Sequence, residues 1–340
     1  MSGTAWSIDP GAAEAALQRL LSATTVVMPT HPHVDADGLA TPLAIMHALA
    51  ARGVRVVPVI GDGILSESLT FLPGIERVVI YGRDQLPSWD LLCLADCSDR
   101  KRLGAFYTDD PQRVEAGAPI VNIDHHVTNE RYGVVQIVEP EASSAAEVVA
   151  ELFRLWDVRL TPDIAQCLLA GIYGDTLGLR TESTTPRTLR TAAALIEAGA
   201  QPAPIVDALF RLKPPSTVCL WRSALENVHW EGPVIWTEIT EAALAECGAD
   251  RSEAEGLVNF LAGTRGSKLA AILYETRDGW RVSMRSLPGI DVARICSVFG
   301  GGGHPRAAGC TVIGDRAELR RFVQRVAQLV ETSPDGSMAD

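Results

Sequence analysis

The chain of 340 residues is longer than a single hydrophobic core usually allows, which predicts two domains. Hydrophobic residues make up 47% and charged residues 21%, a globular composition, and the longest apolar runs are well short of the roughly 20 residues that a membrane helix needs. A net charge of −12 excludes a surface that coats long nucleic acids, because such surfaces neutralise many phosphates with Lys and Arg. We therefore expect binding neither to a membrane nor to long duplex nucleic acid.

The N-terminal segment and the cysteines both favour a cytoplasmic protein. The first 21 residues lack the basic start and the continuous apolar stretch of a signal peptide, and Asp9-Pro10 is typical of a helix start. The seven cysteines are an odd number, and no two of them form a Cys-x-x-Cys pair. Neither a disulfide framework nor a zinc ribbon is predicted, and the thiols are expected to be reduced.

Between residues 24 and 126, short apolar runs alternate with helical or loop segments, which predicts a mainly parallel α/β sheet. The runs are rich in β-branched residues and do not alternate with polar ones, as in strands buried on both faces. They span residues 25–28, 55–60, 77–81, 91–95 and 120–123. Helices flanking this sheet are predicted at residues 38–53, 143–156, 162–173 and 187–213.

A second, smaller α/β domain is expected after the two prolines at 214–215, because a proline disfavours helix at the residue before it. Its predicted strands lie at 233–240, 268–275 and 280–286, and its helices at 251–263 and 315–331. The predicted organisation is a first domain at 1–190, a helical linker at 191–216 and a second domain at 217–335. The active site is expected in the cleft between the two domains.

Acidic and histidine side chains follow three of the predicted strands. They are His31, Asp35 and Asp37 after the first run, Asp96 after the fourth, and Asp124, His125 and His126 after the fifth. A further carboxylate, Asp175, closes a predicted helix in the sequence Gly-Asp-Thr. Because ligands of parallel sheets gather at the carboxyl ends of the strands, these residues are expected to form one site.

Five carboxylates with no interleaved Lys or Arg predict two divalent cations at this site. Without cations the carboxylates would repel one another and raise their own pKa values. Two ions about 3.5–4 Å apart can share a bridging carboxylate, and such pairs stabilise the attacking and the leaving oxygen of phosphoryl transfer. Imidazole and carboxylate ligands without thiolates favour Mn²⁺, with Mg²⁺, Co²⁺ or Fe²⁺ as alternatives.

Six motifs, in this order, resemble those of the DHH family of phosphoesterases that carry a DHH-associated C-terminal domain. The first four are H-x-x-x-D-x-D at 31–37, the Asp at 96, D-H-H at 124–126 and G-D-T at 174–176. The last two are the sequence SMRS at 283–286 and the sequence GGGGHPRAAG at 300–309. The resemblance covers nearly the whole chain, whose layout is most similar to the bifunctional oligoribonuclease and PAP phosphatase branch, the nanoRNases.

The resemblance implies a role for each matched residue. His31, Asp35 and Asp96 would bind one metal ion, and the other would be bound by Asp37, Asp96, His125 and Asp175, with Asp96 bridging. His126 would lie near the scissile phosphate as a donor or general acid, and Asp124 would orient a histidine. The implied substrate-binding residues of the second domain are Ser283, Arg285, Gly301, Gly302, Gly303, His304 and Arg306.

The second domain carries positive charge that the first lacks. Residues 261–310 contain seven basic residues against three acidic ones, a local excess of four positive charges. The four glycines would let backbone N–H groups approach a phosphate, while Arg285 and His304 add charged hydrogen bonds. A terminal phosphate bound here, with the adjacent phosphodiester at the metal ions, would measure a short oligonucleotide from its end.

The predicted function is the hydrolysis of short RNA or DNA oligonucleotides, or of linear dinucleotides, to mononucleotides. Removal of the 3′-phosphate of pAp is a further implied activity. Three alternatives stay open: a cyclic dinucleotide phosphodiesterase, an inorganic pyrophosphatase or polyphosphatase, and a nucleotide-binding regulatory module whose metal site is structural. A homodimer is compatible with the sequence, which does not give the oligomeric state.

Overall fold

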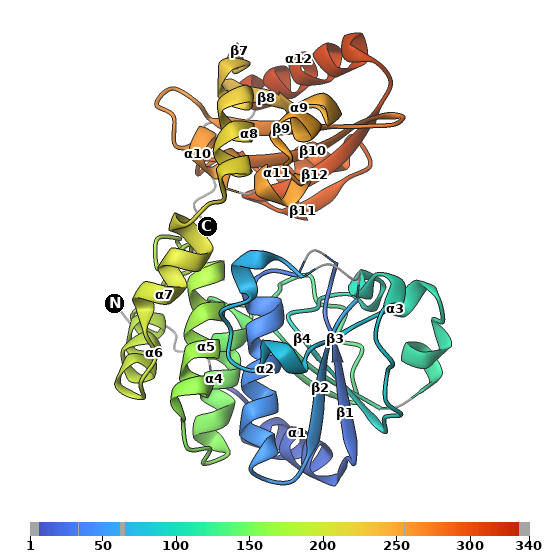
Figure 1. The fold of residues 1–340 in the computed structure, drawn as a ribbon, viewed down its shortest axis with the longest axis vertical. Helices are drawn as coiled ribbons and strands as arrows, with labels where there is room; N and C mark the ends of the chain where they lie inside the picture. Colours follow the sequence, from blue (N-terminus) through green and yellow to red (C-terminus); the bar gives the residue numbers. More distant parts are fainter. Residues whose placement is uncertain (1–6, 33, 62–64, 118, 255, 333–340) are drawn as a thin grey trace. The chain divides into compact units, whose positions relative to one another are not determined.

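The computed structural model describes residues 7–32, 34–61, 65–117, 119–254 and 256–332 (Figure 1). The chain divides into two units, Met1–Leu212 and Lys213–Asp340, each with its own sheet and hydrophobic cores. This boundary falls within residues 191–216, the stretch predicted as a linker. Among the described residues, no helix is both long enough and apolar enough to cross a membrane.

The sheet of the first unit is entirely parallel and has the strand order β3-β2-β1-β4-β5-β6. Its strands are β1 (Thr25–Pro29), β2 (Arg55–Ile60), β3 (Val79–Ile80), β4 (Leu91–Ala95), β5 (Ile120–Asp124) and β6 (Val135–Val138). Every residue of β1, β4 and β5 is buried, which confirms that the continuous apolar runs are strands covered on both faces. The third strand is shorter than predicted, and β6 was not predicted.

Helices cover both faces of this sheet. The helices of this unit are α1 (Pro10–Ser22), α2 (Ala36–Ala50), α3 (Ala105–Thr108), α4 (Ala145–Leu155), α5 (Pro162–Asp175), α6 (Pro186–Glu197) and α7 (Pro202–Val206), of which α6 and α7 pack against α5. Shorter helical turns lie at Glu67–Leu69, Ile75–Arg77, Arg100–Leu103, Arg113–Gly117 and Asp207–Arg211. The largest core lies between the sheet and α1, α2, α4 and α5, and α2 lies beside α5 (Figure 1). The predicted helix at 187–213 is interrupted because Gly199 has a φ of +109° and Pro202 starts a new helix.

The strand order places a crevice at the carboxyl ends of β1 and β4. These two strands are neighbours, yet the chain extends from β1 toward β2 and β3 on one side and from β4 toward β5 and β6 on the other. At such a reversal the connections leave in opposite directions, and ligands of open α/β sheets bind there. The topology therefore predicts the site at the same strand ends as the motifs do.

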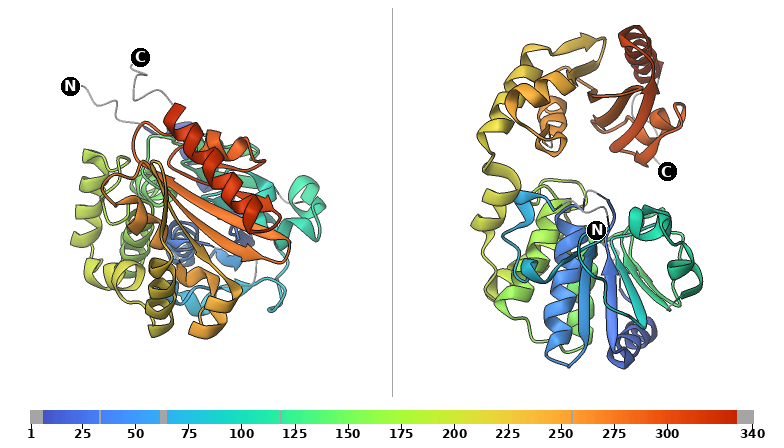
Figure 2. Two further views of the ribbon diagram at one scale, coloured as in Figure 1. Left: turned by 90° about the horizontal axis from the view of Figure 1, so that it is seen from above. Right: turned by 45° about the vertical axis from the view of Figure 1, so that its right-hand side comes forward.

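The second unit contains a mixed six-stranded sheet with the order β11-β12-β10-β9-β8-β7, in which only β8 and β9 pair in parallel (Figure 2). Its strands are β7 (His229–Glu231), β8 (Val234–Ile239), β9 (Leu269–Thr276), β10 (Gly279–Ser286), β11 (Gly302–His304) and β12 (Ala307–Ile313). Its helices are α8 (Pro215–Glu226), α9 (Glu241–Cys247), α10 (Leu257–Ala262), α11 (Val292–Ser297) and α12 (Arg316–Thr332), with a 3₁₀ turn at Arg251–Ala254. One core lies between the sheet and α11 and α12, and another between the sheet and α8, α9 and α10.

The prediction that no cysteines are paired is wrong for one pair. Cys219 on α8 and Cys247 at the end of α9 form a disulfide between positions 28 residues apart. The contact arises from the packing of α8 against α9, which no local spacing rule reveals. The other five cysteines are buried thiols.

Candidate active site

Three neighbouring strands end at the candidate active site. His31 follows β1 by two residues, Asp96 directly follows β4, and His125 directly follows β5. Two helices contribute further carboxylates: Asp35 caps the start of α2, Asp37 lies in its first turn, and Asp175 is the last residue of α5. Residues 144 positions apart in the sequence are thereby brought to one edge of the sheet.

The predicted site residues form three overlapping groups, and within each group the N and O atoms lie within 4.8 Å of one another. The groups are Asp37, Asp96, His125 and Asp175; His31, Asp35 and Asp96; and Asp96, Asp124, His125 and His126. Asp96 belongs to all three. The first two groups coincide with the two ligand sets that the motifs implied, and every predicted residue of this site is brought together by the fold.

Asp96 has both an unusual backbone and an unsatisfied side chain. Its φ of +53° is rare for a residue other than glycine, and such strain costs about 1–3 kcal/mol. The side chain is buried, and its Oδ1 accepts no hydrogen bond from the described residues. Oδ1 lies 3.4 Å from Nε2 of His125, and Oδ2 lies 3.5 Å from Nε2 of His31. A divalent cation on each side of the carboxylate fits this arrangement, because it would satisfy the orphaned oxygen.

The rings of His31 and His125 are oriented as metal-binding histidines usually are. Nδ1 of His31 lies 3.0 Å from the carbonyl oxygen of Pro32, and Nδ1 of His125 lies 3.3 Å from that of Ala142. A proton on each Nδ1 can be donated to these carbonyls, which directs the Nε2 lone pairs toward the carboxylates. Nε2 of His125 is 3.1 Å from Oδ2 of Asp175.

Asp37 is fully buried and is held by the start of α4. Its carboxylate accepts hydrogen bonds from the backbone N–H groups of Ala145 (2.7 Å) and Ala146 (2.9 Å) and from the hydroxyl of Thr41 (2.9 Å). The positive end of the helix dipole and these donors favour the ionised form. Burial and the nearby charges of Asp175 and Asp96 act the other way and raise the pKa of Asp37 well above its usual value. A bound cation would offset both of these effects.

The remaining pKa shifts describe a site whose protons compete with metal. Burial alone would lower the pKa of His31 and of His125, but their interactions with the carboxylates of Asp35, Asp96 and Asp175 outweigh burial and raise both pKa values well above the usual value. Burial raises the pKa of Asp175 to about 6 despite its hydrogen bond with His125. Burial would also raise the pKa of Asp96, but the two histidines lower it overall.

His126 differs from His125 in its partner. Its Nδ1 lies 2.8 Å from Oδ1 of Asp124, a fully buried carboxylate that also accepts the backbone N–H of His125 at 2.8 Å. The Nε2 edge of the His126 ring therefore points away from Asp124. This orientation is compatible with the predicted division of roles, in which His125 binds metal and His126 meets the phosphate.

Two glycines that the motif analysis did not assign to the site make it possible. A Cβ atom on Gly171 of α5 would lie 2.5 Å from Oδ1 of Asp37, and one on Gly38 of α2 would lie 2.8 Å from Nε2 of His31. At either position another residue would fit only if the neighbouring side chain moved. The only sequence signal was the small-residue pattern Gly-Ile-Tyr-Gly at the end of a helix, which indicates close helix packing without naming the neighbour.

The candidate phosphate-binding residues lie around β10 and β12 of the second unit. Ser283 pairs with Gly309, and Arg285 pairs with Ala307. Both side chains alternate with Val282 and Met284, which enter the core under α11 and α12, so they belong to the opposite face. A buried Nη1 of Arg306 has no hydrogen-bond partner among the described residues, as expected of a donor that awaits an anion.

The glycine run has a structural role that the sequence analysis did not identify. A Cβ atom on Gly301 would lie 2.2 Å from the carbonyl oxygen of Gly309, and one on Gly303 would lie 2.6 Å from that of Ala307. These glycines allow β11 to approach β12. A Cβ on Gly302 would meet no described atom within 4 Å, so Gly302 alone among the three has open space beside it. The side chain of His304 lies outside the described part of the structure.

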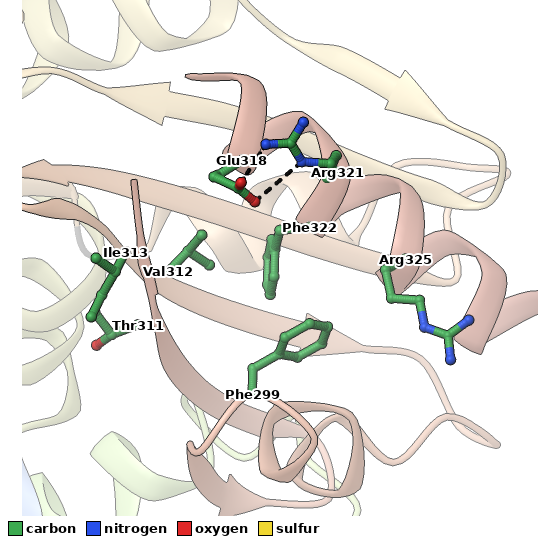
Figure 3. A pocket seen from close by; sticks show the side chains of 8 residues that line it. All are labelled: Phe299, Thr311, Val312, Ile313, Glu318, Arg321, Phe322 and Arg325. Carbon is green, nitrogen blue, oxygen red and sulfur yellow. Dashed lines mark hydrogen bonds and ion pairs between the residues drawn. The ribbon is translucent and has the colours of Figure 1, made fainter. Parts of the chain in front are cut away.

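A separate hollow of about 340 Å³ lies beside α12 in the second unit (Figure 3). The rings of Phe299 and Phe322 pack edge to face at 4.7 Å, and Glu318 pairs with Arg321 at its rim. The hollow contains none of the predicted substrate-binding residues. It is lined by Phe299, Thr311, Val312, Ile313, Glu318, Arg321, Phe322 and Arg325.

Comparisons with known proteins agree with the motifs. The profile of the DHH family, N-terminal domain, matches residues 25–172, and that of the DHHA1 domain matches residues 237–332. The bifunctional oligoribonuclease and PAP phosphatase NrnA of Thermus thermophilus is 32% identical over 313 residues, which span 90% of this chain and 89% of that protein. The protein of the same name from Bacillus subtilis is 27% identical over 85% of this chain and 89% of its own length.

Two further proteins extend the comparison. The cyclic-di-AMP phosphodiesterase PdeA of Listeria monocytogenes is 26% identical over 85% of this chain, but the match covers only 45% of that protein. The crystal structure of an exopolyphosphatase-related protein from Bacteroides fragilis has the same fold, with a TM-score of 0.87 and 21% identity over 96% of this chain and 99% of that one. The expected fold class is confirmed.

We predict that divalent metal binding releases protons. Because His31 and His125 have raised pKa values, a metal ion must displace their protons at neutral pH. The Kd for Mn²⁺ should fall by about 10- to 100-fold per unit of pH between pH 6 and 7, as one or two protons are displaced. Calorimetry in buffers of different ionisation enthalpy measures the number of protons released. A Kd for Mn²⁺ that is independent of pH would contradict the raised pKa values of the two histidines.

Gly171→Ala should impair metal binding more than folding. The added methyl group would displace the Asp37 carboxylate, whereas the rest of α5 can remain helical because alanine favours helix. We expect the Kd for Mn²⁺ to rise by about 10-fold or more, the range seen when the surroundings of a metal ligand are altered. Gly117→Ala is the matched control, since its Cβ would lie 3.6 Å from the nearest atom. Equal affinities of the two variants would argue against Asp37 as a ligand.

Proposed function

This chain belongs to the DHH family, and we propose that it is a metal-dependent phosphoesterase that hydrolyses short oligonucleotides or linear dinucleotides to mononucleotides in the cytoplasm. The single observation that carries the proposal is the carboxylate of Asp96 at the centre of three ligand groups, with an orphaned oxygen. The relationship to two proteins named oligoribonuclease and PAP phosphatase, over nearly their whole lengths, supports the substrate class. A pAp 3′-phosphatase activity is proposed on the same ground.

We propose that Asp96 bridges two divalent ions, of which Mn²⁺ suits this mixture of imidazole and carboxylate ligands best. His31 and Asp35 complete the ligands of one ion, and Asp37, His125 and Asp175 complete those of the other. When bound, the ions would supply Lewis-acid polarisation of the phosphate and an activated water. Asp37 and Asp96 contribute charge that is already fixed in position by the fold, so little reorganisation accompanies binding.

His126 is proposed to donate a proton to the leaving oxygen. The ribose oxygen of a nucleotide is a poor leaving group and needs this proton. The buried Asp124 holds Nδ1 of His126, so its pairing with His126 orients the acid. Both residues are therefore assigned to catalysis and neither to the metal ions.

The second unit is proposed to bind an anionic group of the substrate. The residues assigned to it are Ser283, Arg285, Gly301, Gly302, Gly303, His304 and Arg306. One support is the local excess of positive charge at residues 261–310. Another is Nη1 of Arg306, which is buried and has no hydrogen-bond partner among the described residues. A bound phosphate would favour substrates that have a terminal phosphate over internal positions of a long strand.

A panel of substrates with Mn²⁺ tests this proposal. It consists of pApA, a five-nucleotide RNA, pAp, cyclic di-AMP and pyrophosphate. We expect pApA and the short RNA to be hydrolysed with the highest kcat/KM, and pAp to lose its 3′-phosphate. Cyclic di-AMP as the best substrate would favour an activity like that of the Listeria relative, and hydrolysis of pyrophosphate alone would overturn the proposal.

Asp96→Asn should abolish turnover while the protein stays folded. Asparagine keeps the shape of the side chain and tolerates a positive φ, so the change removes the charge and replaces one acceptor oxygen with an NH2 donor. We expect kcat on pApA to fall by at least about 1,000-fold, as for loss of a group that stabilises transition-state charge. An unchanged melting temperature of the metal-free protein is the control for folding, and retained turnover would contradict a bridging role.

Arg285→Ala should weaken the binding of substrates that carry a terminal phosphate. The loss of a charged hydrogen bond predicts a rise of about 10- to 100-fold in KM for pApA. Hydrolysis of bis(p-nitrophenyl) phosphate, which has no terminal phosphate, should stay within about twofold of that of the unmodified protein. Arg281→Ala is the matched control, because Arg281 lies on the same face of β10 and is exposed. An equal effect of Arg285→Ala on both substrates would show that Arg285 does not bind the terminal phosphate.

A further inference from the structure

The loop after β5 is tied to the turn after β4 by contacts that the assigned roles do not use. The carbonyl oxygen of Cys97, next to Asp96 in the chain, accepts hydrogen bonds from three side chains. They are the hydroxyl of Tyr132 at 2.6 Å and the side-chain amides of Asn122 and Asn129, each at 3.3 Å. The turn that gives Asp96 its positive φ is thus fixed from the side of the β5 loop.

Asn129 also contacts the carboxylate that orients His126. Its Nδ2 lies 2.5 Å from Oδ2 of Asp124, while Oδ1 of Asp124 accepts Nδ1 of His126 at 2.8 Å. The orientation of the amide is fixed, because its Oδ1 accepts the backbone N–H of Arg131 at 2.7 Å. The backbone N–H of Asn129 donates to the carbonyl oxygen of His126 at 3.1 Å, which closes the turn.

We propose that Asn129 is a positioning residue for proton donation by His126, an inference that rests on the proposed function. One amide group joins the carbonyl next to Asp96 to the carboxylate that orients His126, and so fixes the acid relative to the candidate bridging ligand. Asp124 is fully buried, so its Oδ2 cannot turn to water when the hydrogen bond from Asn129 is lost. The carboxylate would then have to rotate toward another donor. The ring of His126 would turn with it.

Asn129 makes one contact that supports the fold, with the carbonyl of Cys97, and one that supports the alignment of His126, with Asp124. Tyr132 and Asn122 also hold the carbonyl of Cys97, so the turn keeps two donors without Asn129. Among the described side chains, only that of Asn129 donates a hydrogen bond to Oδ2 of Asp124. Loss of Asn129 should therefore affect the alignment of His126 more than the fold. A small displacement of a proton donor from the reacting oxygen is enough to slow a reaction strongly.

The choice of leaving group separates proton donation from metal chemistry. The nucleoside oxygen released from pApA needs a proton, whereas p-nitrophenolate released from bis(p-nitrophenyl) phosphate does not. For Asn129→Ala we expect kcat on pApA to fall by about 100-fold, with KM within about threefold. On the aryl substrate kcat should stay within about fivefold of that of the unmodified protein.

Three variants provide the controls. Asn129→Asp has the same shape but cannot donate to Asp124, so it should be at least as impaired on pApA as Asn129→Ala. Tyr132→Phe removes a donor to Cys97 but leaves the contact with Asp124, so it should change kcat on the two substrates by the same factor. Glu130→Ala alters an exposed neighbour and should leave both activities unchanged.

A fourth variant measures the coupling between Asn129 and His126. The double variant His126→Ala/Asn129→Ala should be no slower on pApA than His126→Ala alone, because Asn129 acts through His126. Asn129→Ala would overturn the proposal if it slowed both substrates equally, or if it left kcat on pApA unchanged. If the unmodified protein hydrolysed neither substrate with Mn²⁺, the proposed function itself would fail, and this inference with it.

Discussion

The buried carboxylate of Asp96 is the constraint on which the rest of the site depends. It leaves β4 with a positive φ, is shielded from water, and has an oxygen without a hydrogen bond from the described residues. Each of these features destabilises the folded chain on its own. They persist because β4 is a fully buried central strand, paired in parallel on both sides, and because three side chains hold the carbonyl of Cys97. A rigid sheet thus keeps one carboxylate in a conformation that a bound cation would satisfy.

The helices α4 and α5 bring carboxylates close to Asp96 in opposite ways. The start of α4 attracts Asp37 with two backbone N–H groups, which is a favourable interaction with the helix dipole. The end of α5 approaches because Gly171 lacks a side chain, which removes an obstacle without adding an attraction. Burial, and then repulsion among the carboxylates, raises the pKa values of Asp37 and Asp175. The folded protein therefore contains an electrostatic conflict that protons relieve at low pH and divalent cations relieve at higher pH.

Local patterns predicted the strands and the ligands, because each depends on a few adjacent residues. The continuous apolar runs identified β1, β4 and β5, and the motifs that follow them identified His31, Asp96 and His125. What the sequence did not reveal depends on tertiary neighbours. The role of Gly171 requires knowing that Asp37 lies beside it, and the link from Asn129 to Cys97 spans 32 residues. The disulfide between Cys219 and Cys247 follows from helix packing, and β12 was missed because its two alanines and one glycine lack a strand-like pattern.

The distribution of charge over the chain favours substrates with few phosphates. A chain with a net charge of −12 repels long polyanions. The positive excess at 261–310 is small and local, enough for one or two phosphates and too little for a duplex. A glycine hairpin at β11 and β12 brings Gly302, Arg285 and Arg306 into this region through strand pairing. Selection for short substrates would then follow from how few phosphates the protein can neutralise, without any contact that recognises a base.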